Sequence, residues 1–156
     1  MMNEVELTEK IRERLKADLA LLQLPSEKMA DTVRPPQVVD GYLPPKNATQ
    51  TPDFPYVIAR AGDGQTSESG MSNAEVKLLI GCYSEDYDGH NYCLMVMSYI
   101  RRSLMQNPFL EDSAFRFELP FSWKMFDDQP YPEWILEITT QWSVPTPQQI
   151  PDEGVL

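Results

Sequence analysis

The segment from Gln129 to Pro147, QPYPEWILEITTQWSVPTP, constrains the fold of this chain more than any other stretch. It opens with a Pro-Tyr-Pro turn and then alternates between apolar and polar residues. Because successive side chains on a strand point to opposite faces, the alternation predicts a strand with one face on a core. Pro145 and Pro147 have no N–H for a ladder and end this strand. The predicted core face carries Trp134, Leu136, Ile138, Thr140 and Trp142, and the other face carries Ile135, Glu137, Thr139 and Gln141.

The same period of two predicts three more strands. Residues 54–60 and 74–83 form a pair, the second with Val76, Leu78, Ile80 and Cys82 alternating with charged neighbours. Phe115, Phe117 and Leu119 start another strand, which we expect Pro120 to interrupt before an extended stretch over 121–126.

Helical spacing predicts two helices. Leu7, Ile11, Leu15 and Leu19 recur every four residues in a helix from Asn3 to Leu22, where Asn3 and Glu6 have capping-box spacing. A second helix is expected from about His90 to Gln106, capped near Asp88 and ended by Asn107-Pro108. Its core positions are Tyr92, Val96, either Tyr99 or Ile100, and Leu104.

Three connecting segments complete the predicted organisation. Residues 24–55 hold half of the 14 prolines, so we expect a long Pro-rich connection, with a helical turn starting at Ser26. Residues 61–73 are polar and glycine-rich and too long for a tight turn, which predicts either a projecting mobile arm or a passive surface loop. Residues 148–156 form an extended C-terminal tail with apolar residues that either contacts a neighbour or frays.

These elements predict one α+β domain over residues 1–147, followed by the tail 148–156. The expected architecture is a mostly antiparallel sheet with helices packed on one face. The predicted core contains Leu15, Leu19, Ile58, Val76, Leu78, Ile80, Val96, Phe117, Leu136, Ile138 and Trp142.

The charge balance narrows the function. With 13 basic and 24 acidic residues the net charge is −11, which disfavours nucleic acid as a ligand because that binding depends on neutralising phosphates. Cys82 and Cys93 lie in mostly apolar stretches, which favours buried thiols over a disulfide framework. The acidic N-terminal segment lacks the basic start and apolar run of a signal peptide, so we expect synthesis in a reducing cytoplasm.

Possible chemistry is limited. The segment SEDYDGH (84–90) has an oxygen-ligand spacing, but a calcium loop would need a carboxylate where Met97 stands. His90 and Cys93 are three residues apart on one helix, as in a thiolate–imidazole nucleophile, but no third group orients them. No phosphate-binding glycine loop or metal-ligand spacing is present. The sequence therefore predicts no cofactor, no metal and no enzyme activity.

Three runs, taken in order, resemble a known family. They are GYLPPKNATQTPDFPYVIARAGDG (41–64), EVKLLIGCYSEDYDGHNYCLMVMSYIRRSLMQNP (75–108) and FRFELPFSWKMFDDQPYPEWILEITTQWSVPTP (115–147). In the LPPK turn, the FPYVIAR and VKLLIGCYSED strands and the QPYPEW ending, the chain resembles tail terminator proteins of tailed bacteriophages and prophages. These are also called tail completion or neck proteins. The resemblance covers roughly residues 38–147.

The resemblance implies a structural virion protein of the tail neck, assembled in the host bacterial cytoplasm. Tail terminators form a hexameric ring that caps the tail tube, stops its polymerisation and joins it to the head–tail connector, and DNA passes through the lumen. The family has no catalytic residues. The suspected interface or lumen loop is Asp63, Gly64, Gln65 and Glu68, and the suspected subunit contact is Pro147, Ile150, Val155 and Leu156. The alternatives are a head-closure or connector protein and a cytoplasmic, non-catalytic binding module.

Overall fold

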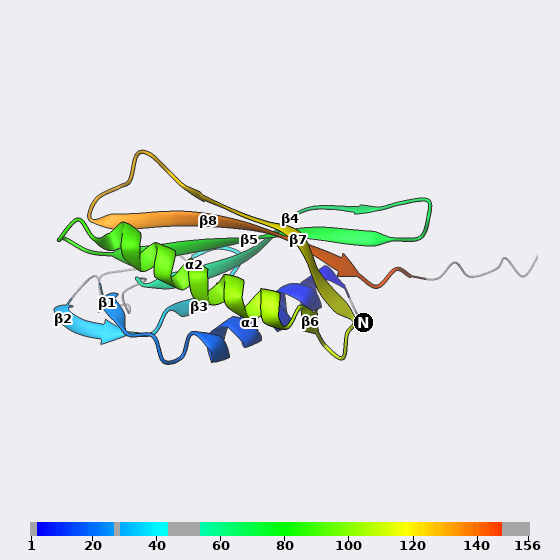
Figure 1. Cartoon of the computed structure of the whole chain (residues 1–156), viewed down its shortest axis with the longest axis horizontal. Coiled ribbons are helices and arrows are strands. Elements are labelled where there is room, and N and C mark those ends of the chain that lie inside the picture. The colour runs from blue at the N-terminus through cyan, green and yellow to red at the C-terminus, as the bar shows by residue number, and fades with distance from the viewer. Residues whose placement is uncertain (1–2, 27–28, 44–53, 148–156) are drawn as a thin grey trace, which may run out of the picture.

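The computed structural model describes residues 3–26, 29–43 and 54–147, which form two helices and eight strands (Figure 1). In chain order these are α1 (Glu4–Asp18), β1 (Leu24–Ser26), β2 (Met29–Arg34), β3 (Gln37–Asp40), β4 (Tyr56–Thr66), β5 (Ser72–Tyr83), α2 (Gly89–Gln106), β6 (Phe109–Leu110), β7 (Phe115–Met125) and β8 (Glu133–Val144).

Six of the strands form one curled sheet in the order β3-β4-β5-β8-β7-β6. Only β3 and β4 run parallel, and every other neighbouring pair in this sheet is antiparallel. The two remaining strands, β1 and β2, form a separate antiparallel pair. The α+β class and the mostly antiparallel sheet predicted from the sequence are therefore confirmed.

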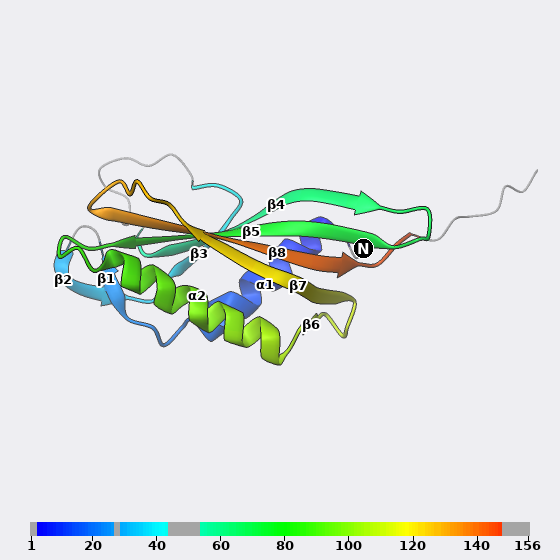
Figure 2. The same ribbon diagram turned by 45° about the horizontal axis from the view of Figure 1, so that its top comes forward.

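Both helices cover the same face of the sheet, as Figure 2 shows. The stripe of leucines and isoleucine on α1 and the apolar side of α2 meet the inward side chains of β5 and β8 in one core. Arg14 links the helices, because its guanidinium donates to the Ser103 carbonyl at 2.5 Å and to the Ser103 hydroxyl at 3.1 Å. The eleven residues of the predicted core list are all buried, and between Tyr99 and Ile100 it is Ile100 that faces inward. Tyr92 and Trp134, which were also expected on the core side, are only half-buried and pack at its margin.

The opposite face of the sheet holds a second, smaller apolar cluster that the sequence did not indicate. Phe54, Tyr56 and Ile58 are buried there against Leu79 and Ile135. Val57 and Ala59, on the other side of β4, lie in the main core. The body of β4 is therefore buried on both faces, and Ile58 belongs to this second cluster rather than to the core under the helices.

Two glycines permit close packing at the ends of the core. A Cβ at Gly81 would overlap the ring of Tyr56, and a Cβ at Gly89 would overlap the indole of Trp134. The Trp134 indole N–H donates to the Ser84 carbonyl at 3.0 Å, so the ring is held where Gly89 makes room for it. The start of α2 is thereby packed onto the start of β8.

Several predicted boundaries were wrong. The predicted strands 54–60 and 74–83 extend further, because backbone pairing continues to Thr66 and Ser72. The first helix ends at Asp18, since Leu19 already has non-helical dihedral angles. By contrast, the interruption expected at Pro120 is present as a register shift between Glu118 and Ser122, and the extended stretch expected after it belongs to the same strand, β7, which continues to Met125.

The Pro-rich segment also contains more regular structure than expected. Ser26 ends strand β1 instead of starting a helical turn, and β2 and β3 follow it. The rest of that segment, residues 44–53, and the tail 148–156 lie outside the described residues. At α2 the N-cap residue is Asp88, as predicted, but its carboxylate accepts a hydrogen bond from the Ser84 hydroxyl rather than from the helix backbone.

Candidate functional site

The projecting end of the β4–β5 hairpin is the first candidate surface, and we call residues 61–73 the arm. Figures 1 and 2 show it extending past both helices. Asp63, Gly64, Gln65 and Glu68, the predicted interface or lumen residues, are all exposed on it. The first three line a shallow polar hollow together with Asn73, Glu75 and Gln141, whereas Glu68 lies in the turn at the tip.

Polar contacts give the arm its form. The Thr66 and Ser72 hydroxyls lie 2.9 Å apart, and the Thr146 hydroxyl lies 3.0 Å from that of Ser72. At the tip the Ser67 amide donates to the Met71 carbonyl at 2.8 Å, and Gly70 has a φ of +82°, which favours glycine. The segment predicted as a projecting arm or a surface loop is therefore mostly a continuation of the β4–β5 hairpin, with a short turn over residues 67–71.

The outer edge of β4 is open along the arm. β3 pairs only with Tyr56–Ala59, so from Arg60 to Thr66 no described strand lies beside β4 on that side. An unpaired strand edge is a template for pairing with another chain. Gly62 and Gly64 sit at the register shift in this stretch, where a Cβ on Gly62 would press against the Glu75 carboxylate.

A second, chemically different surface lies on β7, toward the edge of the sheet opposite to β4. From Glu118 to Met125 no described strand pairs with its outer edge, but Pro120 and the register shift make that edge irregular. Two large apolar side chains stand out, Leu119 at 66% exposed and Trp123 at 45% exposed. We call Leu119 and Trp123 the β7 patch. Leu119 also lines a hollow that reaches Met71 at the tip of the arm, which is 68% exposed.

The segment 84–90 forms a closed turn. The Ser84 hydroxyl contacts the Asp88 carboxylate and accepts from the Asp86 amide at 3.1 Å. The rings of Tyr87 and Tyr131 stack with centroids 4.7 Å apart, and the Tyr131 hydroxyl donates to the Glu85 carbonyl at 2.6 Å. In the described residues no group of three or more His, Cys, Asp or Glu side chains is arranged to hold a metal ion.

His90 and Cys93 each contact Trp134 instead of each other. The Cys93 thiol donates to the Trp134 carbonyl at 3.3 Å, and the His90 ring packs at 5.8 Å from the indole centroid. Both cysteines are free and buried. A hydrogen bond with Cys93, together with burial, raises the pKa of the Cys82 thiol. Both features hold the Cys82 thiol protonated at neutral pH, whereas a nucleophilic cysteine needs its thiolate.

The suspected tail contact is described only at its start. Pro147 is exposed at the end of the described chain, and Ile150, Val155 and Leu156 lie outside the described residues. The β7 patch was missed because the stretch after the interruption at Pro120 was expected only to be extended, with no face assigned to its side chains. The polar Ser122 and Lys124 around Trp123 instead predict its ring on the core side of the strand, opposite Ile138, and no signal in the sequence shows that the ring stays exposed there.

No protein-family model matches this chain, and no curated protein is significantly similar to it. Among the described residues, no helix is long and apolar enough to cross a membrane.

Proposed function

We propose that this chain is a structural subunit of a tailed phage or phage-derived particle, acting as a tail terminator. In this role it forms a hexameric ring that caps the tail tube, stops tube polymerisation and docks the head–tail connector. The sequence resemblance over residues 38–147 suggests the role. The presence of two unlike surfaces on one subunit, the arm and the β7 patch, is the structural observation that carries it.

A closed ring needs a head-to-tail contact, in which one patch of each subunit meets a different patch of the next. The arm offers an open backbone edge with polar side chains. The β7 patch offers apolar side chains next to an edge that Pro120 makes unsuitable for regular pairing. Each subunit therefore carries two different surfaces, as a head-to-tail ring requires, whereas a two-fold dimer would use one surface twice.

The charge of the arm suits a lumen through which DNA passes without being held. Asp63, Glu68 and Glu75 lie on the arm or at its base, and none of the arm residues 61–73 is basic. Carboxylates repel phosphates, so a lumen lined by the arm would not retain the duplex. The proposed partners are therefore copies of this chain, the tail tube protein and the connector. The proposed location is the neck of the virion after assembly in the bacterial cytoplasm, and the role is non-catalytic.

Negative-stain imaging and light scattering of the purified full chain test this function. We expect rings with a central hole and a mass six times that of the 17.9 kDa subunit. The double variant Leu119→Asp/Trp123→Asp should give folded monomers. Leu21→Asp, at a side chain that is 93% exposed after α1, is the matched control and should still form rings. A wild-type chain that stays monomeric even with tail tube protein present would overturn the proposal.

A further inference from the structure

The outward face of α2 carries large apolar side chains that nothing in the described residues covers. Met95 and Tyr99 are one turn apart on the outward side of the helix, and Met105 lies on the other flank of that side. They are 42%, 45% and 53% exposed. A solvated helix face normally carries polar side chains, so exposed apolar side chains gathered in this way mark an interaction surface.

Two arginines on the same helix have no partner. Arg101 and Arg102 are exposed and make no ion pair or hydrogen bond within the described chain. The other described arginines are all engaged: three pair with carboxylates, and Arg34 and Arg60 bond to backbone carbonyls. In a chain with 24 acidic residues, two adjacent free guanidinium groups make a local basic site on an acidic protein.

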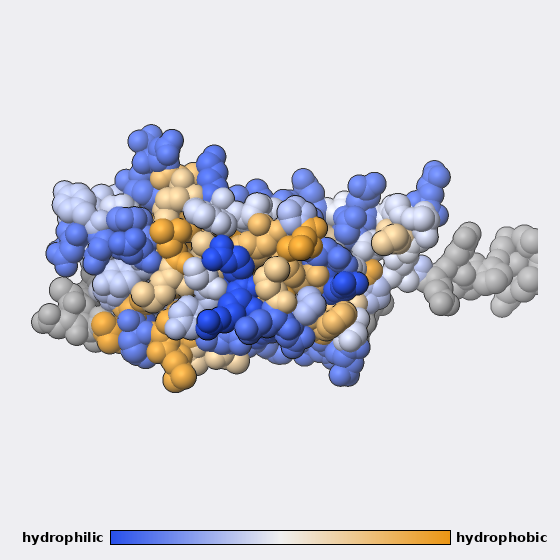
Figure 3. Space-filling view, viewed as in Figure 1, coloured by the Kyte–Doolittle hydropathy of each residue, from blue (hydrophilic) through white to orange (hydrophobic). Residues whose placement is uncertain are grey.

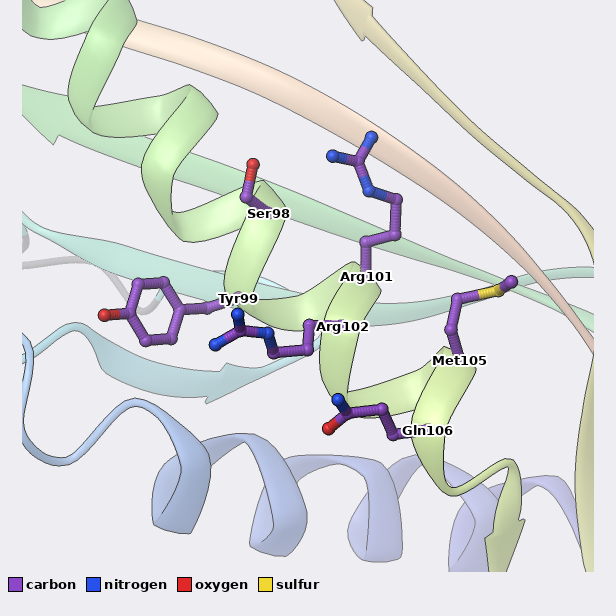
Figure 4. A pocket seen from close by; sticks show the side chains of 6 residues that line it. All are labelled: Ser98, Tyr99, Arg101, Arg102, Met105 and Gln106. Carbon is purple, nitrogen blue, oxygen red and sulfur yellow. The ribbon is translucent and has the colours of Figure 1, made fainter.

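The arginines and apolar side chains surround one shallow hollow. Its lining, shown in Figure 4, comes entirely from α2: Ser98, Tyr99, Arg101, Arg102, Met105 and Gln106. Figure 3 shows strongly hydrophilic and apolar residues side by side at the centre of this side of the molecule. The hollow thus offers positive charge and apolar contact together, which suits a short peptide that is both acidic and apolar.

We propose that this α2 face binds residues 148–156 of a second copy of the chain. The segment reads QQIPDEGVL, so Asp152 and Glu153 complement the two arginines. Ile150 and Val155, on either side of these carboxylates, complement the exposed methionines and Tyr99. The inference rests on the proposed ring function and assigns the surface on the neighbouring subunit that receives the tail.

The length of the exposed α2 face matches that of the C-terminal segment in an extended conformation. Met95 and Met105 are ten residues apart, which is about 15 Å along a helix at 1.5 Å per residue. Ile150 and Val155 are five residues apart, which an extended chain spans in roughly 16 Å. Ile150 and Val155 can therefore each contact one end of the exposed α2 face, while the carboxylates between them lie over the arginines.

The position of the described chain end favours binding of the segment to α2 of a second copy rather than to α2 of its own chain. The Thr146 hydroxyl is bonded to Ser72, next to the turn at the tip of the arm. Figures 1 and 2 show the chain leaving β8 on the arm side, pointing away from α2. To contact the α2 face of its own subunit the following segment would have to turn back, so we assign it to the α2 face of a neighbouring subunit.

Disulfide trapping between full-length copies tests the contact. One copy carries Met105→Cys and the other Val155→Cys, and both native cysteines are buried and do not compete. We expect cross-linked pairs on mixing. Arg101→Glu/Arg102→Glu in the first copy should lower the yield about tenfold, as expected when a charge pair at an interface becomes repulsive. Adding Asp152→Lys/Glu153→Lys to the second copy should restore most of it. Lys16→Glu/Lys77→Glu, with the same change in net charge, is the control and should leave the yield unchanged.

Each other outcome has a distinct meaning. Rings that form without any cross-link would overturn this inference and leave the proposed function standing. Cross-linked pairs in a protein that never forms rings would support the contact and overturn the ring. A chain with both new cysteines that cross-links only within itself would overturn the role of the second copy. Duplex DNA binding in a mobility-shift assay that is lost in Arg101→Glu/Arg102→Glu would assign the face to DNA and also overturn the inference.

Discussion

Strands β4 and β5 run through two environments, the body of the domain and the arm. Comparing them shows that backbone pairing between the strands continues where the burial of their side chains ends. In the body, Val57, Val76 and Leu78 have no exposed surface. In the arm, every residue of β4 from Ala61 to Thr66 is exposed. The ladder nevertheless continues from one region to the other, with Thr66 opposite Ser72 at the far end.

The two regions are therefore stabilised by different interactions. In the body, burial contributes about 0.8 kcal/mol for each methylene removed from water. In the arm, hydrogen bonds such as that between the Thr66 and Ser72 hydroxyls contribute roughly 0.5–1.5 kcal/mol each. We therefore expect substitutions in the body to change the free energy of unfolding more than substitutions in the arm.

The largest effect is expected for Leu136→Ala in β8. Leu136 is completely buried under the helices, and its truncation leaves a cavity that the packed neighbours cannot fill. The free energy of unfolding should fall by about 2–5 kcal/mol. Chemical denaturation with an unchanged m-value checks the prediction. An unaltered transition midpoint would contradict the burial of this face of β8.

Gly89→Ala should be the next most damaging change. The new methyl group would overlap the Trp134 indole, which is held by its hydrogen bond to Ser84. Overpacking of this kind costs about 1–3 kcal/mol. Gly70→Ala in the turn of the arm is the matched comparison. It meets no neighbouring atom and costs only the strain of its positive φ, roughly 1 kcal/mol. Equal losses in thermal unfolding would show that the two regions respond alike.

Thr140→Val tests the one polar side chain buried in the middle of β8. The Thr140 hydroxyl donates to the Val76 carbonyl at 2.6 Å and accepts from the Trp142 indole N–H at 2.8 Å. Valine has nearly the same shape but leaves the indole N–H without an acceptor, at a cost of about 1–3 kcal/mol. Denaturant unfolding measures the loss. Thr140→Ser keeps the hydroxyl and should recover part of it.

The smallest effect on stability, and the largest on association, is expected for Asp63→Lys/Glu68→Lys. Both side chains are exposed, so the free energy of unfolding should change by no more than roughly 0.5 kcal/mol. Joining to tail tube protein, followed by sedimentation, should be impaired because the charge of the arm is inverted. Asp127→Lys/Asp128→Lys in the turn before β8 is the control. If joining by the arm variant is normal, the arm is a passive loop.

The strands and helices of the body were predictable because their periodicity is strict. The alternation around Leu136 and Ile138 places one face of β8 in the core, and the leucine spacing of α1 predicts its buried stripe. Tyr99 and Ile100 are adjacent apolar residues on one helix turn, so sequence alone left either as the inward residue. Packing against the sheet selects Ile100.

The arm and the second cluster were not predictable for the opposite reason. The glycines and serines of the arm show no alternation, so pairing that depends on the backbone alone leaves no sequence pattern. Phe54, Tyr56 and Ile58 share a run with Val57 and Ala59, and a strand buried on both faces has no polar side to mark its orientation. Arg101 and Arg102 were visible in the sequence, but only the structure shows that no carboxylate of the described residues pairs with them.

The ladder between β5 and β8 also has a mechanical consequence. It runs over all twelve residues of both strands, from Ser72 opposite Val144 to Tyr83 opposite Glu133, with no shift of register. Because its hydrogen bonds lie across the strands, a force along the arm loads them in shear, and all of them share it at once. A pull on the tip of the arm is thus carried into the core as a stiff displacement of the whole sheet instead of peeling the hairpin open bond by bond.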